Sequence, residues 1–175
     1  GWQPKDPQIN AAQREAIDHA LAAEDVAIVH GPPGTGKTRT IVELIRQAVA
    51  REQEVLACAP SNLAVDNLVE RLDAAGVRVL RLGHPARVLT HLRSLTLDVL
   101  VDEHPDVAVA RKLLKEASVL KDRAARFTRG KPAPGYKQQL RQEAAEMKAD
   151  AIRIEQQLVA HLIDSAEVIC GTLTG

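Results

Sequence analysis

Short apolar runs alternate with segments of helical spacing in the first half of the chain. The runs that have the character of buried strands are 26–29, 54–59 and 77–82. Apolar residues spaced three and four apart predict helices at 9–23, 36–51 and 62–75. Because strand and helix alternate, the pattern predicts an α/β fold with a parallel sheet.

The second half of the chain has a different pattern. Apolar residues recur at steps of three and four residues in two series, 110–127 and 140–158, and a break rich in glycine and proline separates them. Two heptad-like helices joined by a short loop predict an antiparallel helical hairpin, inserted after the sheet-forming part. A last apolar run at 168–170 predicts a strand that returns to the sheet.

Composition limits the classes of partner. Lys and Arg together number 23, as do Asp and Glu, so the net charge is zero and any surface that binds nucleic acid must be local. Cys58 and Cys170 each lie in an apolar run, which favours buried free thiols in a reducing compartment. No uncharged stretch approaches membrane-spanning length, so a membrane is not an expected partner.

Residues 31–38 read GPPGTGKT and fit the phosphate-binding pattern G-x-x-x-x-G-K-[ST], between a predicted strand and a predicted helix. The glycines let successive backbone N–H groups point at phosphate oxygens, and the start of the helix adds the positive end of its dipole. Lys37 is expected to contact the β- and γ-phosphates and Thr38 to ligate Mg²⁺, so both would contribute to catalysis. The residues expected to bind the nucleotide here are Gly31, Pro32, Pro33, Gly34, Thr35, Gly36, Lys37, Thr38 and Arg39. The alternative is a glycine-proline turn that matches the pattern by chance.

The base is expected to be adenine. GTPases read guanine with an Asn-Lys-x-Asp loop, and no asparagine of this chain precedes a lysine. Gln13 lies upstream of the phosphate loop, and its side-chain amide has the donor and the acceptor that adenine requires. The predicted cofactors are therefore ATP and Mg²⁺. A solvated glutamine on a helix surface is the alternative for Gln13.

Three segments together resemble one family of motor proteins. They are INAAQREAI (9–17), GPPGTGKT (31–38) and APSNLAVDNLVERL (59–72). The set is similar to superfamily 1 helicases, in the branch of the nonsense-mediated-decay helicase and immunoglobulin mu-binding protein 2. RVLRLGHPARV (78–88) is closer to the second of these, and VICGTLTG (168–175) resembles motif Ic of the family.

The resemblance implies an architecture. Residues 1–84 would be the first part of a RecA-like P-loop domain called 1A, with Gln13 as the Q-motif residue that reads adenine. Residues 85–165 would be a mostly helical insertion called 1C, and 166–175 would be the return strand with motif Ic. Members of the branch hydrolyse ATP to move 5′ to 3′ along DNA or RNA and to unwind duplexes. The second RecA-like domain and the Walker B box would lie outside the chain, so the chain alone is expected to bind ATP without turning it over. Such a protein is expected inside the cell, in the cytoplasm, the nucleus or the nucleoid.

The resemblance also assigns residues that would contact a single strand of DNA or RNA. Pro60, Ser61 and Asn62 would be motif Ia, and Thr172 and Thr174 would be motif Ic. The residues of motif Ia support this assignment by themselves, because they follow a predicted strand and begin a predicted helix. A hydroxyl, an amide and helix N–H groups can together hold a phosphate at such a place. The alternative is that Ser61 only caps the helix.

One acidic motif resembles a Walker B strand. In LDVLVDEH (97–104), Asp102 would lie near Mg²⁺ and Glu103 near the attacking water. However, Asp98 interrupts the apolar run, and motif Ic, which precedes the Walker B box in the family, comes later in this chain. We therefore interpret the segment as part of the insertion. If it were the true Walker B box, the chain would be another P-loop ATPase, of the AAA+ or recombinase type.

A basic cluster marks the predicted loop of the hairpin. Between residues 121 and 141 there are seven Lys and Arg residues and one acid, Asp122. Arg126, Arg129 and Lys131 are the residues expected to follow the phosphates of a nucleic-acid strand. A solvated loop tip is the alternative. A further alternative for the whole chain is a non-catalytic nucleotide-binding module whose hairpin docks on a protein.

Overall fold

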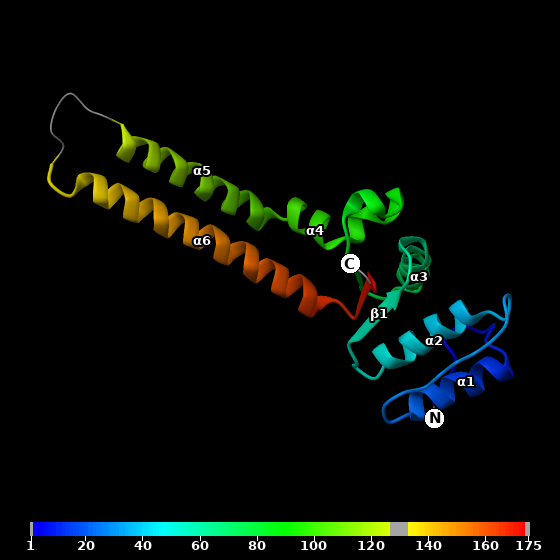
Figure 1. The fold of residues 1–175 in the computed structure, drawn as a ribbon. Helices are drawn as coiled ribbons and strands as arrows, with labels where there is room; N and C mark the ends of the chain where they lie inside the picture. Colours follow the sequence, from blue (N-terminus) through cyan, green and yellow to red (C-terminus); the bar gives the residue numbers. More distant parts are fainter. Residues whose placement is uncertain (1, 127–132, 174–175) are drawn as a thin grey trace. The chain divides into compact units, whose positions relative to one another are not determined.

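The structure, a computed structural model, describes residues 2–126 and 133–173 of the chain. Contacts within the chain divide it into two compact units (Figure 1). The first unit holds Gly1–Leu97 together with Ile163–Gly175, and the second holds Asp98–Leu162. The strands lie in the first unit, and most of the two longest helices lies in the second.

Two short 3-10 helices follow the last strand of the first half. They are η1 (Pro85–Arg87) and η2 (Thr90–Leu95). Both lie in the first unit, although the expected insertion begins at residue 85. Val88 and Leu92 explain this difference, because they are buried in the core of the first unit. The limits of the insertion stay a prediction.

The sheet of the first unit has three parallel strands in the order β1-β3-β2. They are β1 (Val55–Ala59), β2 (Val79–Arg81) and β3 (Val168–Thr172). Val168 pairs with Val55 on one side and with Val79 on the other, so the strand that comes last in the chain is the central one. The strands occur where the apolar runs predict them, and the predicted α/β class with a parallel sheet is confirmed.

Three helices accompany the sheet: α1 (Ala11–Ala22), α2 (Lys37–Val49) and α3 (Asn62–Ala74). Each lies within a predicted helix, and local capping explains where two of them begin or end. Asn10 and Gln13 form a capping box: the side chain of each accepts from the backbone N–H of the other, at 2.9 and 3.1 Å. Gly76, with a φ of 76°, lies just after α3 in the left-handed conformation that ends many helices.

Residues 26–29, predicted as a strand, do not form one. Val26 and Ile28 are instead 78% and 82% exposed. A strand needs a neighbour for its backbone N–H and C=O groups, and none of the strands in the described part of the chain pairs with this segment. The prediction is therefore wrong for this structure, because periodicity detects apolar character and not the presence of a strand to pair with.

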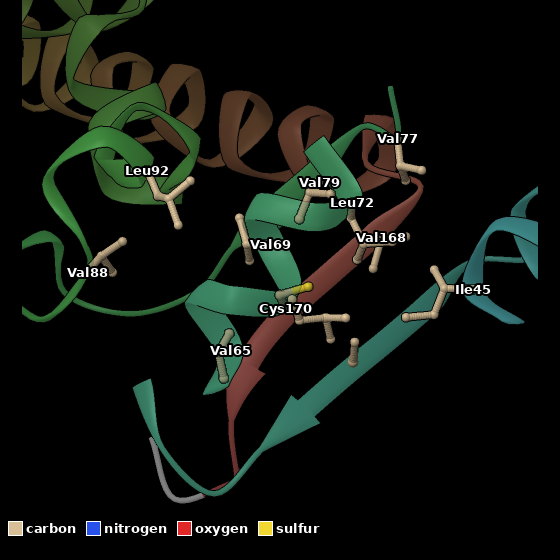
Figure 2. Close-up of a cluster of buried hydrophobic side chains, with 12 residues drawn as sticks. Ile45, Val65, Val69, Leu72, Val77, Val79, Val88, Leu92, Val168 and Cys170 are labelled. Atoms are coloured by element: carbon tan, nitrogen blue, oxygen red, sulfur yellow. The ribbon is translucent and has the colours of Figure 1, made fainter. Parts of the chain in front are cut away.

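Aliphatic side chains fill the space between the sheet and α3 (Figure 2). From α3 come Val65, Val69 and Leu72, which are at most 1% exposed and lie three or four residues apart. Each such side chain contributes about 1.5–3 kcal/mol through burial. Burial raises the pKa of the Cys170 thiol to about 12, against the opposing effect of the Arg81 guanidinium. The thiol is therefore neutral and packs as an apolar group.

The outer face of β1 is open within the described residues. Leu56 is 69% exposed and Cys58 is also exposed, whereas Ala57 between them is buried. Successive side chains of a strand point to opposite faces of the sheet. The prediction that both cysteines are buried is confirmed for Cys170 and wrong for Cys58, because the apolar run suggested two covered faces.

Polar residues of α2 fix the N-terminal segment. Glu43 is 1% exposed, and its carboxylate accepts from the backbone N–H of Lys5 at 2.8 Å and of Asp6 at 3.1 Å. Gln47 donates to the same carboxylate at 2.6 Å and to the carbonyl of Gln3 at 2.9 Å. The segment before α1 is thereby held against the helix that follows the phosphate loop, through a contact that no apolar pattern predicts.

Helices make up the second unit: α4 (Leu97–Glu103), α5 (Pro105–Ala125) and α6 (Tyr136–Ser165), with the ends of α4 and α6 in the first unit. α5 and α6 run side by side (Figure 1). Ala110, Ala117 and Ala124 are buried on α5, and Ala144 and Ala151 are buried on α6. Each set repeats every seven residues and falls on one of the two predicted apolar series. No helix in the described part of the chain combines the length and the apolar character needed to cross a bilayer.

The segment that resembles a Walker B strand is helical. Residues 97–103 form α4, Asp102 pairs with Arg111 of α5, and the side chain of His104 caps α5 by accepting from the N–H of Asp106 at 3.2 Å. A Walker B carboxylate follows a buried strand. The interpretation that this segment is not a Walker B strand is therefore confirmed.

Candidate nucleotide site and nucleic-acid interface

The phosphate loop is an exposed turn that leads directly into α2. Gly34 and Gly36 have φ angles of 84° and 81°, which residues with a Cβ rarely adopt. Gly36 also lies against Gln13, because a Cβ added at Gly36 would be 2.5 Å from Gln13 Nε2. Glycine is thus required at position 36 both by the backbone angle and by the neighbouring side chain.

The N-terminus of α2 is able to receive an anion. Gly36 is its N-cap and makes no side-chain hydrogen bond there. Lys37 and Thr38, the first two residues of the helix, are exposed. The first N–H groups of a helix have no partner within the helix, and the positive end of its dipole lies at the same place. The residues of the loop therefore fit the phosphates of a nucleotide.

The ammonium group of Lys37 lies over the carbonyl oxygens of its own loop. Nζ donates to Gly31 at 2.5 Å and to Pro32 at 2.9 Å. The hydroxyl of Thr35 donates to the same Pro32 carbonyl at 2.9 Å. A phosphate oxygen carries full negative charge and is a stronger acceptor than a carbonyl, so it would compete well for the ammonium group.

Gln13 is bonded to the phosphate loop. Its Nε2 donates to the carbonyl of Thr35 at 3.2 Å, while its Oε1 accepts from Asn10 in the capping box. A side-chain amide has two hydrogens and two acceptor positions, so each bond uses half of what it offers. The remaining hydrogen and lone pair are those that an adenine contact would need.

Two hollows adjoin the loop. One, of about 370 Å³, has Gln13, Thr35 and Lys37 in its lining. The other, of about 450 Å³, is lined by Gly34, Gly36, Lys37, Thr38, Arg39 and Arg71. Lys37 lines both hollows, and the other predicted residues are divided between them, with Gln13 and Thr35 at one and Gly34, Gly36, Thr38 and Arg39 at the other.

Two arginines add positive charge to the larger hollow. Arg39 was predicted from the sequence, and it forms an ion pair with Asp6 at 3.3 Å. Arg71 lies on α3 and was missed, because an arginine on the polar side of a helix has no pattern that distinguishes it from a solvated residue. Both would favour an anionic ligand.

Thr38 is the expected ligand for Mg²⁺ and is exposed in the first turn of α2. In such sites Mg²⁺ keeps several waters and takes most other ligands from the phosphates. No group of three or more His, Cys, Asp and Glu that could hold a metal occurs within residues 2–126 and 133–173. An exposed hydroxyl in the first turn of α2 fits a Mg²⁺ that arrives with the nucleotide.

The described residues assigned to motifs Ia and Ic, which are Pro60, Ser61, Asn62 and Thr172, lie at the carboxyl end of the sheet. Pro60 and Ser61 follow the last residue of β1, and Thr172 is the last residue of β3. Ala59 and Thr172 are partners in the register of these neighbouring strands. Segments more than a hundred residues apart in the sequence are therefore adjacent at the carboxyl ends of parallel strands, where ligands of open α/β sheets usually bind.

Ser61 caps α3. Its Oγ accepts from the N–H of Ala64 at 3.3 Å, as the structural alternative predicts. The bond uses a lone pair and leaves the hydroxyl hydrogen for another acceptor. Ser61 is exposed and Asn62, the first residue of α3, is half-buried. Capping and phosphate binding are thus compatible at this position.

Part of the predicted interface falls outside the described residues. Arg129, Lys131 and Thr174 belong to that part. Arg126 is described, and it is the exposed C-cap residue of α5.

The chain is similar to known proteins along almost all of its length. Residues 8–175 match the family described as AAA domain. The chain is 35% identical over 168 residues to DNA polymerase alpha-associated DNA helicase A of Schizosaccharomyces pombe, a match that covers 96% of the chain and 25% of that protein. It is 38% identical over 169 residues to DNA-binding protein SMUBP-2 of Mesocricetus auratus, covering 95% of the chain and 16% of that protein.

A third relative represents the other protein of the same branch. The chain is 31% identical over 176 residues to the Regulator of nonsense transcripts 1 homolog of Arabidopsis thaliana, covering 97% of the chain and 12% of that protein. The chain spans a quarter or less of the length of these three relatives. The chain belongs to the superfamily 1 helicases, in the branch of immunoglobulin mu-binding protein 2 and the nonsense-mediated-decay helicase.

Proposed function

We propose that this chain is the ATP-binding part of the first motor domain of an ATP-dependent helicase, which moves 5′ to 3′ along a single strand of DNA or RNA. The phosphate loop carries the proposal. Two glycines in the left-handed conformation, Gly34 and Gly36, lead into α2, and Lys37 is its first residue. No side chain caps this helix N-terminus. The 5′ to 3′ direction of movement and the single-stranded DNA or RNA substrate come from the family resemblance.

Within the nucleotide site each residue has one role in the proposal. Backbone N–H groups between Gly31 and Thr38 bind the phosphates, and Lys37 exchanges its carbonyl contacts for the β- and γ-phosphates. Thr38 gives one hydroxyl ligand to Mg²⁺, which supplies charge neutralisation at the transferred phosphate when it is bound. Gln13 uses the free half of its amide to read adenine.

The strand binds at the edge that carries Ser61, Asn62 and Thr172. Hydroxyl and amide donors beside the N-terminus of α3 suit phosphate oxygens, which are acceptors. Pro60 and Thr174 complete the two motifs in the proposal. Arg126, Arg129 and Lys131 would add a second, purely electrostatic contact at the loop of the predicted helical hairpin, and this contact rests on sequence alone.

In the proposal, parts of the protein outside this chain complete the catalytic site. In the proposal residues 1–84 and 166–175 belong to the RecA-like domain 1A, and 85–165 form the insertion. The Walker B carboxylates and a second RecA-like domain come from the rest of the protein, which acts inside the cell. The chain alone binds ATP and strand without sustained hydrolysis. The helical α4 argues against the alternative that Asp102 and Glu103 act as Walker B in another kind of P-loop ATPase.

Binding of a single strand is expected to be weak and strongly dependent on salt. Each phosphate contact made by a cation releases a counterion, so affinity falls by about tenfold or more between 50 and 200 mM salt when several contacts form. Fluorescence anisotropy of labelled DNA and RNA oligonucleotides measures this. Neutralising Arg126, Arg129 and Lys131 together should reduce the salt dependence while leaving ATP affinity unchanged.

Two results would contradict the proposal. A chain that binds ATP but no oligonucleotide, and that captures a protein through its predicted helical hairpin, would be a nucleotide-binding docking module. A chain that hydrolyses ATP steadily, and stops when Asp102→Asn is introduced, would be another class of P-loop ATPase.

A further inference from the structure

An arginine with no exposed surface lies at the end of β2. Arg81 is 0% exposed and its partner Asp66 of α3 is 2% exposed. Nε of Arg81 donates to one carboxylate oxygen of Asp66 at 2.9 Å, and the other oxygen accepts from the N–H of Leu89 at 2.9 Å. Two charges removed from water need partners of this quality, because an unpaired buried charge is strongly destabilising.

The rest of the guanidinium reaches the residue that begins α3. Nη2 donates to the side-chain oxygen of Asn62 at 2.9 Å, and Nη1 donates to the carbonyl of Leu82. Asn62 and Asp66 are four residues apart on α3, so they lie on one face of the helix. One arginine thus holds the first two turns of α3 to the carboxyl end of β2.

Gly83 leaves the space that the guanidinium occupies. A Cβ added there would lie 3.1 Å from Nη1 of Arg81, and the φ of Gly83 is 137°. A side chain at this position would therefore meet both strain and crowding. Glycine at position 83 therefore leaves the room beside the backbone that the guanidinium of Arg81 uses.

The contact decides which way the Asn62 amide faces. A guanidinium has donors only, so it must meet the oxygen of the amide and not its NH₂ group. The two N–H donors of Asn62 are left for another acceptor. Asn62 is half-buried, next to the exposed Ser61, at the helix N-terminus that suits a phosphate.

We propose that Arg81 is a positioning residue for nucleic-acid binding: it orients the Asn62 amide so that the N–H groups of Asn62 donate to a phosphate of the bound strand. The proposal rests on the proposed function and extends it to a residue that cannot touch the strand itself. Charge balance requires only the pair with Asp66, so the additional bond to Asn62 is the observation that connects the buried pair to the interface.

A double-mutant cycle tests this coupling in the 175-residue chain. Arg81→Lys keeps a charge for Asp66 but lacks the planar fork whose separate nitrogens reach Asp66, Leu82 and Asn62. We expect Arg81→Lys and Asn62→Ala each to weaken binding of labelled oligothymidylate about tenfold, the effect of one hydrogen bond to a charged group. The double variant should bind as Asn62→Ala alone does, because Arg81 acts through Asn62. Affinity for ATP should not change in any of the three.

Two controls separate orientation from general loss of stability. Arg78→Lys makes the same replacement at an exposed arginine of the same region, which pairs with Glu167, and should leave strand binding unchanged. Val69→Ala removes a buried methyl pair from α3 without touching the network, and should lower the unfolding midpoint while strand binding is kept at temperatures where the chain is folded.

The outcomes are distinct. If the wild-type chain binds no oligonucleotide, the proposed function is overturned and this inference with it. If the wild type binds and the losses of Arg81→Lys and Asn62→Ala add in the double variant, only the inference is overturned. Should Arg81→Lys not fold, Arg81→Met combined with Asp66→Asn takes its place in the cycle: both buried charges are removed together, so neither is left unpaired, and the same non-additivity with Asn62→Ala is expected.

Discussion

Lys37→Ala is expected to lower the affinity for ATP about a hundredfold, because one ammonium group that bridges two phosphates supplies hydrogen bonds between charged groups. The fold should not change. Lys37 is exposed, and the partners of its Nζ are the carbonyls of Gly31 and Pro32 in the same loop. Isothermal titration calorimetry with Mg²⁺ and a non-hydrolysable ATP analogue gives the affinity, and circular dichroism melting shows whether the fold is kept.

Lys115→Ala is the matched control. Lys115 is an exposed lysine on α5, so the same change of charge is made away from the loop. ATP affinity should stay within about twofold of the wild type, since surface changes are usually small. Equal losses in the two variants, or an unchanged affinity in Lys37→Ala, would mean that the loop does not bind the phosphates.

Glu43→Ala should lower the free energy of unfolding of the first unit by about 3 kcal/mol, because it leaves the backbone N–H groups of Lys5 and Asp6 without their acceptor. Both bonds are shorter than 3.2 Å, and the carboxylate is 1% exposed. Trp2 is the single tryptophan of the chain and lies in the segment that Glu43 holds, so its fluorescence reports release of that segment. Urea titration followed by this signal and by circular dichroism measures the loss.

The control for Glu43 is Glu15→Ala. Glu15 is an exposed glutamate of α1, and its removal should change stability by less than about 0.5 kcal/mol. If Glu43→Ala shifts the urea midpoint no more than Glu15→Ala does, the N-terminal segment is held by other contacts.

Elements with a strong local signal were predictable from the sequence. α1 has a capping box, α3 a serine N-cap and a glycine after its end, and α5 and α6 have regular apolar series. Each signal depends on residues close together in the chain. The phosphate loop belongs to the same class, since its glycines and its lysine lie within one turn and the start of one helix.

Features that depend on distant residues were not predictable. Residues 26–29 have the apolar character of a strand, but a strand also requires a partner elsewhere. Arg81 lies in an apolar run and its side-chain partners Asp66 and Asn62 are 15 and 19 residues away, so its bonds follow from the tertiary fold. An arginine inside a predicted buried strand was the one available signal. Glu43 is similar, because its backbone partners precede it by 37 and 38 residues.

The order of the strands affects how the chain acquires its structure. β1 and β2 are separated in the sheet by β3, which follows both of them in the sequence, so neither can pair with β3 before residues 168–172 leave the ribosome. The contacts of α1, α2 and the long helices are more local and form early by comparison. Bringing β3 between its neighbours closes a long loop, whose entropic cost grows only slowly with length. During synthesis the local helical contacts can therefore form before the three-stranded sheet, and Ser61 and Thr172 become neighbours only after β3 has joined β1.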